Sequence, residues 1–232
     1  MKRIVVPLVL ALLVMSIGSY VRSLKLFDGS EPLDLLRKRL EIDRIPVDTE
    51  DDDPNSPIKG MTAAMKAAAD GRLDVLELVV SKGADIDKKD RTFGYTPLMH
   101  AIVNNNQLQL VIVQYLINKA RSHVGMRSML GLRPVHLLLE VSKVDDRMAM
   151  MRLIMDKGGD INSQTDTGDT AMHLAVQRPA ELNWIKFLMQ VYGSQLNLSI
   201  KNKKGETPLD IANKLAYQDI AIALGGPSAY TR

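Results

Sequence analysis

Histidine is the residue type in this chain with the clearest capacity for catalysis or metal binding, because the sequence has four histidines and no cysteine. His136 and His173 stand 37 residues apart, whereas His100 and His123 have no such relationship to them. A transition-metal site needs several Cys or His ligands, usually including a pair a few residues apart on one element. No two of these histidines are three or four residues apart. The sequence therefore predicts no transition-metal site and no cofactor.

Signatures of nucleophilic catalysis and of phosphate-binding loops are also missing from the sequence. There is no Gly-x-Ser-x-Gly turn, and residues 204–207 (Lys-Gly-Glu-Thr) lack the glycine spacing of a phosphate loop. Two acidic pairs occur, Asp145 with Asp146 and Asp166 with Asp169, and helix starts or exposed turns explain them better than acid–base catalysis does. We therefore predict that the protein is not an enzyme and has no small-molecule substrate.

An eight-residue phrase recurs through the sequence and contains three of the four histidines. Its clearest copy is residues 94–101 (Gly-Tyr-Thr-Pro-Leu-Met-His-Ala). The copies begin at Gly60, Gly94, Gly131, Gly168 and Gly205, which are separated by 34, 37, 37 and 37 residues. A fixed period in this range predicts stacked supersecondary units.

The phrase has the composition of a turn followed by a helix start. Glycine allows the positive φ of a tight turn, Thr96 can cap the new helix, and Pro97 suits the first helical position. In the first copy a second apolar helix follows over residues 73–80, and the unit closes at residues 83–87 (Gly-Ala-Asp-Ile-Asp). Each unit is therefore predicted to contain a turn, two helices and a closing loop.

This pattern resembles the ankyrin repeat over residues 58–224. The resemblance implies an all-α ankyrin-repeat helical solenoid, in which helix–turn–helix repeats are joined by β-turn fingers. The repeats would occupy residues 58–89, 90–124, 125–162, 163–198 and 199–224 of a domain spanning 58–226, followed by a tail at 227–232. In the family the histidine of the phrase hydrogen-bonds around its own threonine, so the resemblance assigns His136 and His173 a structural role.

Several copies depart from the family pattern. Ala63 replaces the proline and Met65 the histidine in the first copy, and Arg133 replaces the threonine in the third. Ala120 replaces the glycine expected after the second helix of the second repeat. A missing cap weakens a helix start by about 1 kcal/mol, which a stack of repeats tolerates.

The N-terminus has the pattern of a secretory signal peptide. Lys2 and Arg3 precede an apolar run over residues 4–15, and small residues follow it. We expect a signal peptide over residues 1–18, or as far as residue 23. The apolar run is shorter than the ~20 residues of a membrane span, and an uncleaved anchor is the alternative.

The overall charge gives no indication of a nucleic-acid partner. The formal charge is +3 for the whole chain, and loss of Lys2 and Arg3 leaves 28 basic against 27 acidic residues, or +1. A balance this close to neutral provides little attraction for a polyanion or an anionic membrane surface.

Residues 23–59 lie outside the repeats. Leu33, Leu36 and Leu40 share one helical face, so we expect a capping helix that covers the open side of the first repeat. A helix reserved for a partner is the alternative. Residues 48–57 are acidic and contain prolines, and they lack the glycine and distal glutamate of a calcium-binding loop. We expect them to form a solvated linker.

Ankyrin proteins typically bind protein partners along the concave side, through the turn tips and the exposed faces of the first helices. Transferring that expectation selects the residues beside the glycines of four repeats. They are Phe93, Tyr95, Met129, Leu130, Leu132, Asp166, Asp169, Lys203, Lys204 and Glu206. The first five are large and mainly apolar and the others are charged, which is the usual anatomy of a protein-binding surface. In the alternative interpretation the apolar side chains turn back into their own core.

The sequence as a whole predicts an exported, non-catalytic protein-binding module that is monomeric apart from its partner. Some exported bacterial ankyrin proteins are periplasmic immunity proteins that neutralise cell-envelope toxins. This family analogy yields the most concrete hypothesis, an inhibitor of a toxin such as a secreted phospholipase. The alternatives are a secreted effector that binds a host protein and an envelope scaffold or accessory protein of an enzyme. Membrane attachment is expected only if the N-terminal segment stays uncleaved.

Overall fold

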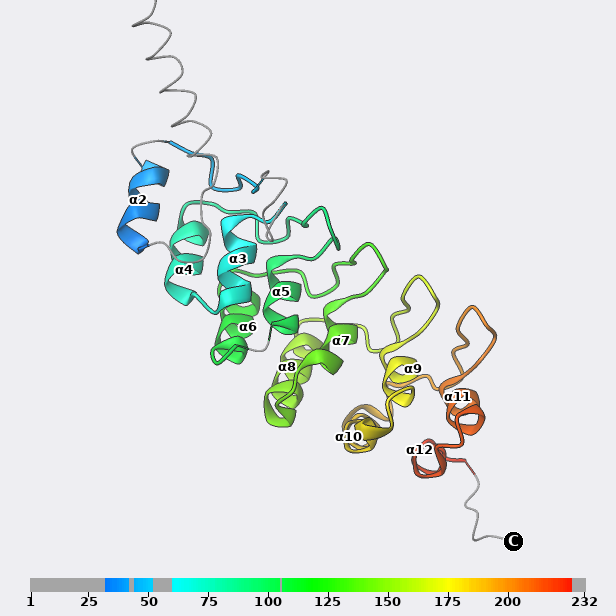
Figure 1. Ribbon diagram of the computed structural model, residues 1–232. Helices are drawn as coiled ribbons and strands as arrows, with labels where there is room; N and C mark the ends of the chain where they lie inside the picture. The colour runs from blue at the N-terminus through cyan, green and yellow to red at the C-terminus, as the bar shows by residue number, and fades with distance from the viewer. Residues whose placement is uncertain (1–31, 42–43, 52–59, 105, 227–232) are drawn as a thin grey trace, which may run out of the picture.

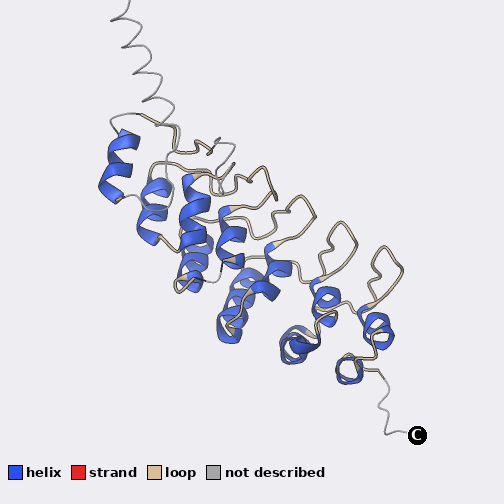
Figure 2. Ribbon diagram, in the orientation of Figure 1, coloured by secondary structure: helices blue, strands red, loops and turns tan. Residues whose placement is uncertain are grey.

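The computed structural model describes residues 32–41, 44–51, 60–104 and 106–226. The expected signal peptide at residues 1–18 and the expected tail at 227–232 lie outside the described residues. Within the described part of the chain every regular element is a helix, and Figure 2 shows helices joined by loops without a strand. None of the described helices combines the length and the apolar character needed to cross a membrane.

The described helices form consecutive pairs preceded by a single helix, α2 (Leu33–Glu41). In chain order the pairs are α3 (Ala63–Asp70) with α4 (Leu73–Ser81), α5 (Pro97–Val103) with α6 (Gln109–Asn118), α7 (Pro134–Leu137) and η1 (Leu138–Glu140) with α8 (Val144–Asp156), α9 (Ala171–Val176) with η2 (Pro179–Glu181) and α10 (Leu182–Tyr192), and α11 (Pro208–Lys214) with α12 (Gln218–Ala223). Figure 1 shows these pairs side by side, with α2 at one end of the stack and α12 at the other. Long loops between the pairs project to one side of the stack (Figure 1).

The first helices of successive pairs pack on one another, in the order α3, α5, α7, α9 and α11. Second helices also meet, α6 contacting α8 and α10 contacting α12. Small side chains permit close packing in the first row, where Ala64, Ala67 and Ala68 of α3 are fully buried. Each pair thus buries its apolar face against its neighbours, and one core runs through the stack.

Threonine caps start most of the first helices. The side-chain oxygens of Thr62, Thr96, Thr170 and Thr207 each accept the backbone N–H three residues later. Arg133 makes no such side-chain bond, and α7 has only four residues before the chain continues as η1. The short helix is consistent with the loss of a cap at this position.

The loop after α6 reverses direction at Arg121, one residue later than the sequence predicts. Arg121 has φ +64°, in the same left-handed region as Gly83 (+85°) and Gly158 (+84°) in the corresponding loops. The amide of Ala120 still donates to the carbonyl of Tyr115 at 3.1 Å, so Ala120 belongs to the end of the helical turn. The prediction that Ala120 replaces the glycine is therefore wrong, and Arg121 occupies that place.

The helix α2 lies against the first helix pair. It contacts α4, and its Leu36 is fully buried, while Leu33 and Leu40 are partly buried against the same core. Glu41 at its end forms an ion pair with Lys82 at 2.7 Å. The three leucines thus share the buried face that their spacing predicts.

The described part of the acidic segment contacts the loop that follows the first helix pair, and this differs from the expected solvated linker. The carboxylate of Asp48 accepts the backbone N–H of Asp85 at 3.0 Å. Glu50 forms an ion pair with Lys88 at 2.9 Å, and the side chain of Glu50 is only 15% exposed. Residues 52–59, the remainder of this segment together with its C-terminal neighbours, lie outside the described residues.

Candidate protein-binding surface

Four loops that connect the helix pairs share one hairpin-like shape, and we call them the first to fourth fingers. Each is closed by a backbone hydrogen bond from the N–H of its first residue to the carbonyl of its last. These bonds run from Asp90 to Tyr95 (2.9 Å), Ser128 to Leu132 (2.8 Å), Thr165 to Asp169 (2.9 Å) and Asn202 to Glu206 (2.9 Å). The fingers carry all the residues that the sequence selects for binding.

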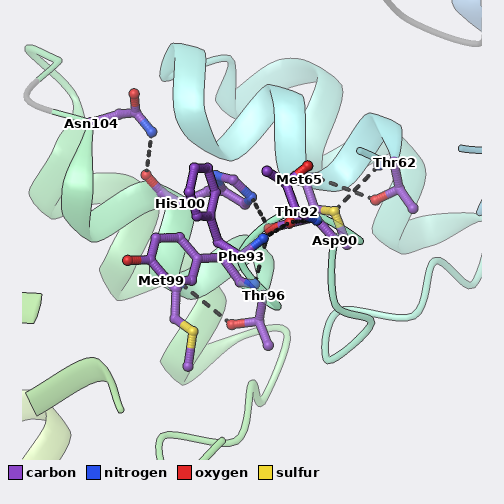
Figure 3. A network of polar contacts seen from close by, with 10 residues as sticks. Thr62, Met65, Asp90, Thr92, Phe93, Thr96, Met99, His100 and Asn104 are labelled. Atoms are coloured by element: carbon purple, nitrogen blue, oxygen red, sulfur yellow. Dashed lines mark hydrogen bonds and ion pairs between the residues drawn. The ribbon is translucent and has the colours of Figure 1, made fainter. Parts of the chain in front are cut away.

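The carboxylate of Asp90 organises the first finger (Figure 3). One oxygen accepts the N–H groups of Thr92 and Phe93, both at 2.7 Å. The other accepts the N–H of Tyr95 at 2.9 Å and lies 3.0 Å from Nε2 of His100. Burial raises the pKa of this carboxyl, but His100 and the three amides outweigh burial and lower the pKa to about 2. The ionised carboxylate thereby holds the backbone that carries Phe93.

Neutral side chains take the place of Asp90 in the other fingers. Each accepts backbone N–H groups within its own finger: Ser128 from Leu130 (3.3 Å) and Leu132 (3.0 Å), Thr165 from Asp169 (3.2 Å), and Asn202 from Lys204 (3.0 Å) and Glu206 (3.1 Å). All four organising side chains belong to buried residues. Each finger therefore has an internal polar anchor that fixes its backbone.

Neighbouring fingers are joined by backbone hydrogen bonds. The N–H groups of Met129, Asp166 and Lys203 donate to the carbonyls of Phe93 (2.9 Å), Leu130 (3.1 Å) and Thr167 (2.9 Å), respectively. Glycine permits this approach, since a Cβ at Gly94 would lie 2.9 Å from the amide nitrogen of Met129. The fingers thus form one connected surface instead of four independent loops.

The apolar candidates divide into exposed tips and half-buried side chains. Phe93, Met129 and Leu130 are 56%, 58% and 68% exposed. Tyr95 and Leu132 are half-buried and pack against the core. The Tyr95 ring also contacts Phe93, with centroids 5.5 Å apart, and burial raises the pKa of its phenol. The structure therefore brings three exposed apolar side chains together on the first two fingers.

An ion pair between the second and third fingers lies beside these tips. Arg127 and Asp166 are 2.6 Å apart, and about half of each side chain is exposed. Sequence reasoning selected Asp166 and missed Arg127, which lies two residues before Met129. Only the neighbouring finger identifies Arg127 as part of this surface, because its partner is 39 residues away in the chain.

The remaining charged candidates lie on the third and fourth fingers. Asp169 accepts hydrogen bonds and is partly buried, and Glu206 is ion-paired with Lys214 at 2.5 Å. Lys203 and Lys204 are exposed, and neither side chain has an ion pair with any residue that the structure describes. These two lysines are therefore the charges of the set that remain available to a partner.

The histidines of the recurring phrase belong to the scaffold. Nδ1 of His136 accepts the N–H of Arg133, and its Nε2 donates to the carbonyl of Ser163, both at 2.9 Å. His173 bridges its own helix cap to the carbonyl of Glu206 at 3.1 Å in the same way. Burial lowers the pKa of both rings, which favours the neutral form. Each ring therefore joins a first helix to the backbone that precedes the first helix of the next repeat.

The described residues contain no group of three His, Asp or Glu side chains that could hold a metal ion. Asp145 and Asp146 lie in the first turn of α8, where acidic side chains favour a helix start. The finger surface instead combines a fixed backbone, exposed apolar tips and flanking charges. This arrangement is suited to contact with a protein surface.

A family model for ankyrin repeats, described as three copies, matches residues 33–127 and 137–229, which is more than half of the chain. The chain therefore belongs to the ankyrin-repeat family, and its fold is an all-α ankyrin-repeat solenoid. The family is generally a non-enzymatic protein-interaction fold, and its repeats imply a protein partner.

Curated relatives match the chain over short parts of their own length. Ankyrin repeat and SAM domain-containing protein 6 of Mus musculus is 33% identical over 105 residues, which cover 44% of this chain and 11% of the relative. Alpha-latrotoxin-Lg1a of Latrodectus geometricus is 26% identical over 157 residues, which cover 68% of this chain and 11% of the relative. Putative ankyrin repeat protein FPV031 of fowlpox virus is 30% identical over 145 residues, which cover 60% of this chain and 40% of the relative. The chain thus spans about a tenth of the first relatives, and the similarity concerns the repeats.

Proposed function

We propose that this protein is a non-catalytic binding module whose protein partner docks on the finger tips. The observation that carries the proposal is the exposure of Phe93, Met129 and Leu130 on two fingers that share a backbone hydrogen bond. Large apolar side chains at adjacent exposed positions are typical anchors of protein interfaces. Because the backbone that presents them is already fixed, binding requires little further ordering.

The charges around this apolar cluster define the rim of the proposed interface. The Arg127–Asp166 pair lies next to it, and Lys203 and Lys204 lie beyond on the fourth finger. A partner with an apolar centre and carboxylates toward the fourth finger would complement this pattern. Rim charges of this kind act mainly on association rate and specificity.

The finer assignment is a periplasmic immunity or inhibitor protein that neutralises a cell-envelope toxin, such as a secreted phospholipase. Its support is the signal-peptide pattern over residues 1–18 together with the analogy to exported members of the family. A secreted effector that binds a host protein is the second candidate, supported by the same N-terminal pattern, and an envelope scaffold is the third. In each case the protein is exported, monomeric apart from its partner, and attached to a membrane only if the N-terminal segment is retained.

The double variant Phe93→Ala/Leu130→Ala tests the binding surface. Partners captured from the envelope fraction by the wild-type protein are identified, and their affinities for both proteins are measured by calorimetry. We expect the double variant to bind at least ~10-fold more weakly, as loss of two central anchors usually does, with its thermal midpoint nearly unchanged. A large fall in the midpoint would instead show that these side chains belong to the core.

Val111→Ala/Val191→Ala is a matched control. Both valines are exposed apolar residues, 41% and 42%, on the second helices α6 and α10, away from the fingers. Partner affinity should stay at the wild-type level in this variant. Mass spectrometry of the protein's N-terminus in its own cell tests export, because an N-terminus near residue 18 supports cleavage and a retained Met1 supports an anchor.

A further inference from the structure

A polar cavity of about 570 Å³ lies between the loop that follows α6 and the loop that follows α8. The first loop contributes Arg121, Ser122 and His123, and the second contributes Lys157 and Gly158. Of the nine described residues that line the cavity, three carry basic groups and none is acidic. The lining therefore favours an anionic ligand.

Arg121 occupies its position at a conformational cost. Its φ of +64° is in the left-handed region, where Gly83 and Gly158 stand in the corresponding loops. A Cβ at either glycine would meet nothing within 4 Å, so the backbone conformation and not space explains the glycines. A non-glycine residue held in this conformation is strained, and such strain is concentrated at functional sites. The presence of arginine instead of glycine at this strained position in the cavity lining is thus the first feature that needs an explanation.

Ser122 provides an independent observation. Its hydroxyl is buried and has no hydrogen-bond partner among the described residues. The residue is 7% exposed and forms part of the cavity wall. Ala84 and Gly159 hold the same place in the other loops, because their amides, like that of Ser122, donate back to the preceding helix. A buried hydroxyl without a partner calls for an explanation. Its oxygen is closed to solvent in this structure, so it reaches a ligand in the cavity after rotation about χ1 to another staggered rotamer.

His123 adds a third donor at the cavity edge. Asp87 lies beside Nδ1 of the ring and also accepts the backbone N–H of His123 at 2.9 Å. The hydrogen bond from the ring to Asp87 raises the pKa of His123, which keeps the imidazole protonated over a wider pH range. Because Asp87 balances that charge, Nε2 is a directional donor more than a source of net charge.

The position of Lys157 at the end of a helix is explained without a ligand, so Lys157 by itself is no evidence for an anion site. Lys82, Lys119 and Lys157 all stand at the C-caps of second helices, where a cation stabilises the helix dipole. Arg121 and Ser122 do not recur in this way, since the equivalent residues of the neighbouring loops are glycine or alanine. The distinguishing features of the cavity are these two side chains.

We propose that this cavity binds the phosphate group of a small anionic ligand, with Arg121 and Ser122 as the principal donors and Lys157 as an additional cation. A guanidinium can donate to two phosphate oxygens at once, and a hydroxyl supplies a third donor from another direction. The tetrahedral phosphate group has enough oxygens to accept from all of them. The site does not include the finger tips, so the test of this proposal is independent of the proposed protein-binding function.

Titration of the full chain with inorganic phosphate, followed by NMR or calorimetry at constant ionic strength in chloride, tests the proposal. The wild-type protein should show saturable binding. Arg121→Gly should bind phosphate at least ~10-fold more weakly while remaining at least as stable without ligand, because glycine relieves the strained conformation. Ser122→Ala should also weaken binding. Lys119→Gln removes a neighbouring cation that does not line the cavity and should leave the affinity unchanged.

Further arms of the titration identify the ligand chemistry. Phosphoserine that binds more tightly than inorganic phosphate would indicate an organic phosphate monoester, whereas equal affinity would indicate inorganic phosphate as the ligand. Acetate should bind at least ~10-fold more weakly, because a planar carboxylate has fewer oxygens to accept. The proposal is overturned if Arg121→Gly retains wild-type affinity, if acetate binds as well as phosphate, or if the wild-type response is linear and equal to that of chloride.

Discussion

The backbone amide of Met129 donates a 2.9 Å hydrogen bond to the backbone carbonyl of Phe93. These two residues carry exposed apolar side chains on different fingers, 36 positions apart in the chain. The bond makes the relative position of the two side chains a property of the backbone. The proposed interface is therefore ordered before a partner arrives, which reduces the entropy lost on binding.

Gly94→Ala should destabilise the protein by more than its backbone conformation alone explains. A methyl group at Gly94 would lie 2.9 Å from the Met129 amide nitrogen, and φ is +69°. We expect a loss of about 1 kcal/mol for the left-handed conformation and a further ~1–3 kcal/mol for the clash. Urea unfolding measures the sum of these two losses as a fall in the free energy of unfolding.

Gly205→Ala and Gly83→Ala are the matched controls for that substitution. Both glycines have positive φ, +77° and +85°, but an added Cβ would meet nothing within 4 Å at either site. Each control should therefore lose only about 1 kcal/mol. Equal losses at Gly94 and in both controls would contradict a close approach between the first two fingers.

Asp90→Asn should lower the free energy of unfolding by about 2 kcal/mol at neutral pH, because the carboxylate accepts three backbone N–H groups and faces His100. The folded-state pKa of about 2 lies below the unfolded value of 3.8. The stabilisation is therefore fully present above about pH 4 and is lost as the pH falls through 2, with a total of roughly 2 kcal/mol. The difference between wild type and variant should shrink over this range.

Asp166→Asn provides the comparison for Asp90. Asp166 is ion-paired with Arg127, but half of its side chain is exposed, so its removal should change stability by less than about 1 kcal/mol. Unfolding curves at pH 7, 4, 3 and 2 distinguish the two sites. If the difference in free energy of unfolding between the wild type and Asp90→Asn stays constant down to pH 2, the carboxylate does not titrate as expected.

His136→Gln/His173→Gln should flatten the dependence of stability on mildly acidic pH. Burial lowers the pKa of both folded-state rings below 6.5. Their contribution is therefore present above pH 6.5 and is lost as the pH falls toward the folded-state values, since the unfolded chain binds protons first. At pH 7.5 the variant should also lose about 1 kcal/mol per inter-repeat hydrogen bond. Urea unfolding at pH 7.5, 6.5 and 5.5 measures both effects.

The contribution of His123 to stability should depend on pH in the opposite direction to that of His136 and His173, and His123→Gln tests this. The pKa of exposed His123 is raised by its hydrogen bond to Asp87, so its contribution is present below pH 6.5 and is lost as the pH rises through the folded-state value. Removing it should leave the acidic destabilisation of the wild-type protein intact. If His123→Gln alone abolished that destabilisation, the buried rings would not be its source.

Sequence reasoning was most successful where the interactions are local. The caps at Thr96 and Thr207 and the positive φ of Gly94 and Gly205 depend on residues within one turn of the chain, so the recurring phrase predicts them directly. The same local logic led to an error at Ala120. One extra residue at the end of the helical turn places the left-handed conformation at Arg121, and the residues of the phrase do not specify that extra residue.

The candidate surface could be predicted only as a set of positions. Phe93 and Tyr95 flank the same glycine and are equally eligible in the sequence, yet Phe93 is exposed and Tyr95 packs against the core. Arg127 was not selected, because its contact with Asp166 crosses from one finger to the next. Side-chain exposure depends on the neighbouring repeat, which the residues of one phrase do not specify.

By itself, the sequence determined the period, the helix starts, the turn glycines and membership of a stacked α-helical family. These features repeat because each rests on hydrogen bonds and steric limits within a few residues. Only the tertiary structure decided which finger side chains remain exposed, how Glu50 contacts the loop after the first helix pair and where Arg121 and Ser122 line a cavity. The physical reason is that exposure and cavities arise from contacts between repeats, which join residues about 27 to 40 positions apart.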